Sequence, residues 1–133
     1  MSAEGVRVAR IDDIPPVDWD DVEWRPVRHH LGIEAFGVNA WSAGAGVPPV
    51  DEHDEVEDGT DGHEELYVVM RGRAAFTVDG EAIDAPAGTV IAVTDPALRR
   101  SAVAEEDGTL ILAVGAPRGR AYAVAGWESR RLG

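Results

Sequence analysis

Residues 65–93 read ELYVVMRGRAAFTVDGEAIDAPAGTVIAV, and this stretch decides the fold class. Apolar runs rich in valine, isoleucine and aromatic residues alternate with short glycine-containing turns, the pattern typical of successive antiparallel strands. Asp79-Gly80 is a strong hairpin signal, because both residues tolerate the positive φ of a tight two-residue turn. The strands predicted between the turns span 65–70, 73–78, 81–85 and 89–93.

The same pattern continues on both sides of this stretch. Downstream, strands are predicted at 99–104 and 109–114, separated by the polar turn 105–108. Upstream, residues 36–41 alternate between small or polar and apolar side chains with a period of two. Short strands at a spacing of about 8–12 residues indicate an all-β sandwich or barrel. A helical period is visible only at 121–127, and it is short.

The N-terminal part of the chain is less regular. Proline at positions 15, 16 and 26 excludes a long helix, because proline removes a backbone donor and restricts the residue before it. We predict a short edge strand at Val6–Ile11, followed by an irregular arm whose Trp19 and Trp24 pack on the body of the protein. Trp41 and Trp127 are expected to cover a barrel end or a dimer seam.

Length and charge narrow the function classes. A chain of 133 residues fits one domain with one core. The net charge of −13 disfavours nucleic acid and anionic membranes as partners, because like charges repel. The absence of cysteine excludes disulfides and thiolate metal sites. With no apolar run long enough to span a membrane and no leader-like N-terminus, we expect a cytoplasmic protein.

Residues 51–65 carry nine acidic residues and two histidines. A solvated acidic loop is the simplest interpretation of such a run. Strand geometry offers another, because residues i and i+2 share a face. If 50–55 and 63–70 are neighbouring antiparallel strands, His53 lies near Glu65 and Glu55 lies near His63. Imidazole and carboxylate together suit Zn, Fe, Mn or Ni. The candidate metal ligands are therefore His53, Glu55, His63 and Glu65.

The spacing of these residues resembles the first motif of the cupin family. His53 falls on the family's first ligand histidine, Glu55 stands where the second should be, and Glu65 falls on the ligand glutamate, seven residues before Gly72. The resemblance covers about residues 35–115. It implies a cupin-type double-stranded β-helix, a jelly-roll-like barrel, with an irregular N-terminal arm. The predicted parts are the arm at 1–30, the barrel at 31–116 and a C-terminal extension at 117–133.

The second cupin motif is eroded, and Arg99 stands at the position of the third ligand histidine. A guanidinium stays protonated and cannot donate a lone pair to a metal. Two outcomes remain open. His63 replaces the missing histidine in an atypical metal site, or Arg99 pairs with Glu65 or binds the carboxylate of a small ligand in a metal-free pocket. Tyr67 is either a general acid in that pocket or a core aromatic residue with a satisfied hydroxyl.

Two functions follow as hypotheses. In the first, the barrel binds a small molecule oriented by Tyr67, Arg99 and the His/Glu cluster, with a weak or atypical divalent metal site or none. In the second, the protein is a metal-dependent enzyme of dioxygenase, isomerase or lyase type. A third possibility is a structural role with an inert pocket. The resemblance to small cupins also implies a homodimer in which the arm or an edge strand crosses to the partner.

Overall fold

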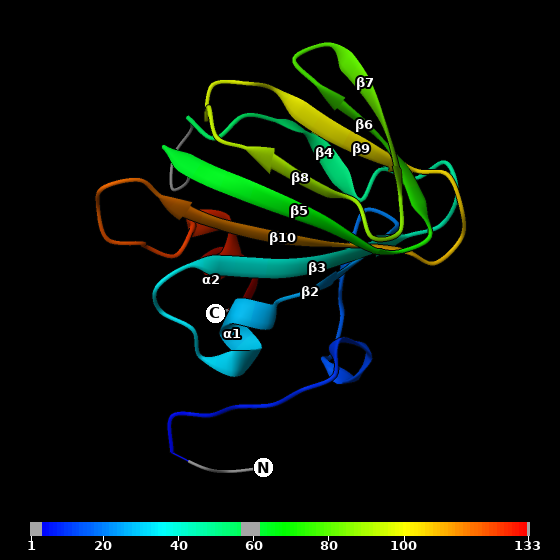
Figure 1. The fold of residues 1–133 in the computed structure, drawn as a ribbon. Helices are drawn as coiled ribbons and strands as arrows, with labels where there is room; N and C mark the ends of the chain where they lie inside the picture. The colour runs from blue at the N-terminus through cyan, green and yellow to red at the C-terminus, as the bar shows by residue number, and fades with distance from the viewer. Residues whose placement is uncertain (1–3, 57–61, 133) are drawn as a thin grey trace.

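The computed structural model describes residues 4–56 and 62–132, and Figure 1 shows their arrangement. Strands dominate the described chain, which confirms the predicted all-β class. The helical elements are η1 (Ile11–Asp13), α1 (Val27–Leu31) and α2 (Gly126–Leu132). The strands are β1 (Val17–Trp19), β2 (Val22–Arg25), β3 (Gly37–Ala43), β4 (Val50–His53), β5 (His63–Arg71), β6 (Arg73–Val78), β7 (Glu81–Pro86), β8 (Val90–Val93), β9 (Arg100–Ala104) and β10 (Thr109–Pro117).

The strands form two antiparallel sheets that face one another (Figure 1). One sheet has the order β1-β2-β3-β10-β5-β8, and the other has the order β4-β9-β6-β7. Alternate residues of both sheets point inward and form one core, as the period of two predicts. The buried members of this core come from both sheets: Val50, Tyr67, Val69, Ala74, Phe76, Ala85, Ile91, Val93, Ala102, Ile111 and Ala113.

The β6–β7 hairpin forms where the sequence predicts it. Val78 pairs with Glu81 across Asp79 and Gly80, whose φ angles are 50° and 79°. A close approach of two chain segments explains the glycine at position 72, between β5 and β6. A Cβ on Gly72 would lie 2.8 Å from the Cα of Thr109, and its φ of 76° also favours glycine. The chain can therefore cross from one sheet to the other at this point.

The prediction of an edge strand at Val6–Ile11 is wrong. Residues 6–10 form no regular element, and η1 begins at Ile11. Val6 and Val8 are 45% and 67% exposed, so a strand at these positions would bury neither side chain and would gain no packing. The arm instead contributes the hairpin β1–β2, which extends the larger sheet because β2 pairs with β3.

The acidic segment also differs from its prediction. Strand β4 pairs with β9 in the smaller sheet, whereas β5 pairs with β10 and β8 in the larger one. Residues 50–55 and 63–70 are therefore not neighbouring strands, but face each other from opposite sheets. The predicted helix at 121–127 lies later in the chain, as α2. None of the described helices is long and apolar enough to cross a membrane.

Candidate functional site

A cavity of about 480 Å³ lies between the sheets and is bordered by the C-terminal extension. A second cavity of about 210 Å³ adjoins it and is mainly apolar. The two share five lining residues, which place a polar floor beside an aromatic wall. The shared residues are Trp41, His53, Glu65, Ala113 and Trp127.

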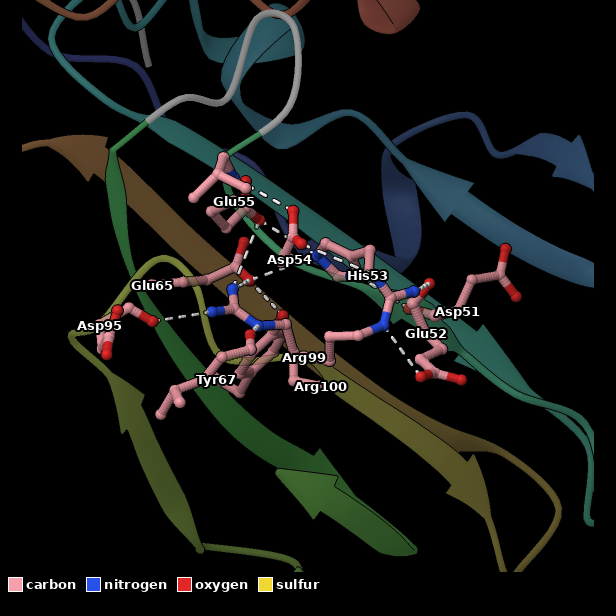
Figure 2. A network of polar contacts seen from close by, with 12 residues as sticks. Asp51, Glu52, His53, Asp54, Glu55, Glu65, Tyr67, Asp95, Arg99 and Arg100 are labelled. Atoms are coloured by element: carbon pink, nitrogen blue, oxygen red, sulfur yellow. Dashed lines mark hydrogen bonds and ion pairs between the residues drawn. The ribbon is translucent and has the colours of Figure 1, made fainter. Parts of the chain in front are cut away.

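The polar floor belongs to a cluster of four charged side chains, which we call the inner cluster: His53, Glu55, Glu65 and Arg100. Arg100 lies behind the floor and lines neither cavity. Nε2 of His53 lies 3.1 Å from Oε1 of Glu55 and 3.7 Å from Oε1 of Glu65. Nη1 of Arg100 lies 3.3 Å from the same Glu65 oxygen and 3.7 Å from the same Glu55 oxygen. Oε1 of each glutamate thus lies near both a ring nitrogen and a guanidinium nitrogen (Figure 2).

The hydrogen bonds of His53 define its charge. Its Nδ1 lies 2.7 Å from the backbone oxygen of Asp51, and its Nε2 contacts the Glu55 carboxylate. A carbonyl and a carboxylate both accept, so both ring nitrogens donate and the ring is an imidazolium. Burial alone lowers the pKa of His53, but the hydrogen bonds to Glu55 and Glu65 outweigh it and raise the pKa to about 10. His53 therefore carries a positive charge at neutral pH.

Arg100 is the most deeply buried cation of the site, with an exposed fraction of 0%. Its Nε donates to the backbone oxygen of Leu98 at 2.9 Å, and its Nη2 donates to that of Asp95 at 3.4 Å. The turn that precedes β9 therefore fixes the plane of the guanidinium. Its remaining donor, Nη1, is directed at the two carboxylates (Figure 2).

The predicted pairing of Arg99 with Glu65 is wrong, and Arg100 makes that contact instead. Consecutive residues at a strand end point to opposite faces, so a shift of one residue exchanges the inner and the outer side chain. Arg99 lies at the cavity rim with its side chain 54% exposed, 3.0 Å from Glu52 and 3.6 Å from Asp54. It still lines the larger cavity, so a ligand contact there stays a prediction.

Tyr67 is a buried residue of β5 whose hydroxyl donates to Oε1 of Glu65. Its ring packs on Phe76 with the centroids 5.4 Å apart, as a core aromatic residue does. Burial, followed by the nearby Glu65 charge, raises the pKa of Tyr67 well above its usual value. Burial also disfavours the charged form of Glu65, yet its bonds to His53 and Tyr67 lower its pKa overall. Glu65 is therefore ionised and Tyr67 is neutral.

His63 lines the same cavity but lies outside the inner cluster. Its ring packs near Tyr122 of the C-terminal extension, with the centroids 5.7 Å apart. Burial lowers the pKa of His63, although the nearby Glu65 charge opposes this shift. Of the four predicted metal ligands, only His53, Glu55 and Glu65 bring donor atoms within 4.8 Å of one another among the described residues.

The aromatic wall consists of four tryptophans from four separate segments: Trp19, Trp24, Trp41 and Trp127. Trp24 stacks on Trp41 at a centroid distance of 5.8 Å, while Trp19 meets Trp127 edge to face at 5.4 Å. Three of them, Trp19, Trp41 and Trp127, line the smaller cavity. The sequence identified these residues singly, and no local pattern shows that they converge.

The donor set does not fit a resident divalent metal in this arrangement. His53, Glu55 and Glu65 are suitable ligand types. The guanidinium of Arg100, however, contacts one oxygen of Glu55 and one oxygen of Glu65 and cannot itself be a ligand. Two unit charges 4 Å apart interact by roughly 4 kcal/mol at an effective dielectric of 20, and a dication would double that repulsion.

Comparison with known proteins identifies the fold. No protein-family model and no curated protein matches the chain. Among solved structures, a cupin protein from Bacteroides fragilis aligns over 98% of this chain and 97% of its own, with 18% identity and a TM-score of 0.66. The chain has the cupin fold. Two further solved structures align over most of the chain.

KdgF from Halomonas sp. aligns over 80% of this chain and 91% of its own, with 18% identity and a TM-score of 0.66. A predicted oxalate decarboxylase from Thermotoga maritima aligns over 82% of this chain and 97% of its own, with 20% identity and a TM-score of 0.65. At these identities the likeness carries the cupin fold alone, because one fold hosts many chemistries. The function has to be argued from the site.

Proposed function

We propose that this cupin-fold protein binds a small organic molecule with a planar ring in the two adjoining cavities. The observation that carries the proposal is the position of the tryptophan wall directly beside the inner cluster. A ring packs on Trp41 and Trp127, while its polar substituents reach His53 or Glu65, which line both cavities. Ligand sites typically combine an apolar lining with a few convergent polar groups in this way.

The charges of the site favour a neutral or cationic ligand. Arg99 lies against Glu52 and Asp54 at the rim, and Arg100 lies against Glu55 and Glu65 in the interior. Neither guanidinium is therefore available to an anion without the loss of an ion pair, and the whole chain carries a charge of −13. An anionic ligand enters against this field, whereas a cation gains from the aromatic faces and from the charge of the whole chain.

Three ring compounds of matched size test this proposal: benzylamine, benzamide and benzoate. Titrations of the full chain, followed by tryptophan fluorescence and isothermal calorimetry, are expected to show binding of the first two and weaker binding of benzoate. Trp127→Leu is expected to weaken binding, since Trp127 lines both cavities. Phe36→Leu serves as the control, because Phe36 lines neither cavity. Tightest binding of benzoate, or binding that Trp127→Leu leaves unchanged, contradicts the proposal.

The alternative function is that of a metal-dependent enzyme of dioxygenase, isomerase or lyase type. It is favoured by the three donors of His53, Glu55 and Glu65, which lie within 4.8 Å of one another. Mass-spectrometric metal analysis of protein purified without a histidine tag separates the two functions. One equivalent of Zn, Fe, Mn or Ni that His53→Ala and Glu65→Ala both remove supports the enzyme, and less than a tenth of an equivalent supports the binding protein.

We also propose that the protein is a homodimer. The outer face of β5 and β8 leaves Leu66, Met70 and Val90 exposed, and Val90 is 62% exposed. Apolar side chains gathered on one sheet face are typical of an interface. Light scattering is expected to give twice the chain mass of 14.2 kDa, and Val90→Glu is expected to give the monomer. A monomeric wild-type protein at high concentration contradicts this proposal.

A further inference from the structure

The inner cluster has a cation of its own at the point where its donor atoms converge. Nη1 of Arg100 contacts one oxygen of Glu65 at 3.3 Å and one oxygen of Glu55 at 3.7 Å. The same two oxygens contact Nε2 of His53. A metal bound by this set would have to lie among these three side chains, and the guanidinium nitrogen already contacts two of their donor atoms.

Arg100 cannot leave this position without loss. Its side chain is fully buried, and two backbone carbonyls, of Leu98 and Asp95, hold its other nitrogens. Turning the guanidinium outward would break both hydrogen bonds and leave Glu55 and Glu65 without their guanidinium. The cation is therefore a fixed part of the barrel.

The fixed charge of Arg100 also opposes a metal ion. A guanidinium stays protonated, so Glu55 and Glu65 face a permanent positive charge at Nη1. A dication bound by the same two oxygens would lie next to that charge and would be repelled by it.

We propose that Arg100 takes the place of a divalent cation in this cluster, so that replacing it with histidine turns the cluster into a metal site. Arg100→His removes the buried charge and adds an imidazole at the inward-facing start of β9, opposite His53 and Glu65. The resulting set of two histidines and two glutamates has the number and type of ligands that Zn²⁺ and Mn²⁺ accept. This proposal does not depend on which organic ligand the cavities hold.

The test is a metal titration of the full chain after dialysis against a chelator, with Mn²⁺ followed by electron paramagnetic resonance and Zn²⁺ by calorimetry. Wild-type protein is expected to show no stoichiometric binding. Arg100→His is expected to bind one equivalent at least about 100-fold more tightly than wild type, because the charge that repels the dication is gone. Zn²⁺ is also expected to raise the melting temperature of this variant and not that of the wild type.

Two matched variants show whether the charge of Arg100 is the cause. Arg100→Lys keeps the charge and is expected to bind no more metal than wild type. Arg99→His adds an imidazole one residue away, at the exposed rim, and is also expected to behave as wild type. Circular dichroism establishes that each variant is folded before its titration is interpreted.

Either of two results overturns the proposal. A folded Arg100→His protein that binds metal no better than wild type shows that Arg100 only fills space in the core. The second result is that wild-type protein binds one equivalent of Mn²⁺ and that Glu65→Gln removes it, which would show that Arg100 does not exclude the metal. This measurement requires no Arg100 variant. Neither result bears on the ring-compound titrations, so the two proposals fail independently.

Discussion

Arg99 and Arg100 are adjacent in the chain, yet their surroundings differ completely. Arg99 belongs to the rim network, which we define as Arg99, Glu52 and Asp54, and its side chain is 54% exposed. Arg100 belongs to the inner cluster and is fully buried. Among the described residues, each guanidinium contacts two carboxylates. Because breaking a buried ion pair costs more than breaking an exposed one, we expect the two arginines to contribute differently to stability.

The largest effect is expected from removing the inner cation. Arg100→Met leaves Glu55 and Glu65 buried without their guanidinium, and breaking a buried pair in this way costs about 3–5 kcal/mol. Urea unfolding followed by tryptophan fluorescence measures this loss in free energy of unfolding. A variant with wild-type stability would show that the inner cluster is solvated and would remove the contrast with the rim.

A smaller effect is expected from the hydroxyl group of Tyr67. Tyr67→Phe removes the donor to Glu65, and a hydrogen bond to a charged group contributes about 1.5–3 kcal/mol. The free energy of unfolding should fall by that amount. Thr77→Val serves as a control, because it removes a hydroxyl from an exposed residue of β6. Unchanged stability would mean that His53 and Arg100 alone satisfy Glu65.

The pH dependence of stability should follow His53. Its folded pKa of about 10 exceeds the ordinary value of 6.5, so its contribution is complete below pH 6.5 and is lost as the pH rises through 10. Melting temperatures measured from pH 7 to 10.5 should therefore fall more in wild type than in His53→Gln. Equal slopes for the two proteins would show that the imidazolium gives no stability.

The smallest effect is expected at the rim. Arg99→Gln should change the free energy of unfolding by about 0–1 kcal/mol, because exposed ion pairs are well solvated and screened. Added salt should reduce even this difference. A loss as large as that of Arg100→Met would contradict the account of both networks.

Local signals predicted those parts of the fold that depend on neighbouring residues. The hairpin of β6 and β7 forms where Asp79-Gly80 indicates it, because the turn and the alternation of the flanking residues agree. The pairing of β4 with β9 joins His53 to Arg100 across a long stretch of chain. No local signal encodes such a partner, and for this reason the predicted pairing of 50–55 with 63–70 was wrong.

The sequence predicts only the part of the site that depends on local alternation. Period-two alternation brings His53 and Glu65 inward, and the structure places them 3.7 Å apart. Whether Arg99 or Arg100 points inward depends on the register of β9, because a shift of one residue exchanges the inward and the outward side chains. The convergence of Trp19 and Trp127 required the path of the whole chain, since these residues lie at its two ends.

The most direct test of the account is a crystal structure of the wild-type protein grown in the presence of Mn²⁺, with anomalous data collected for the metal. We predict the guanidinium of Arg100 in contact with both Glu55 and Glu65, with no anomalous peak among the side chains of the inner cluster. A peak bound by His53, Glu55 and Glu65, with Arg100 turned away, would contradict the account.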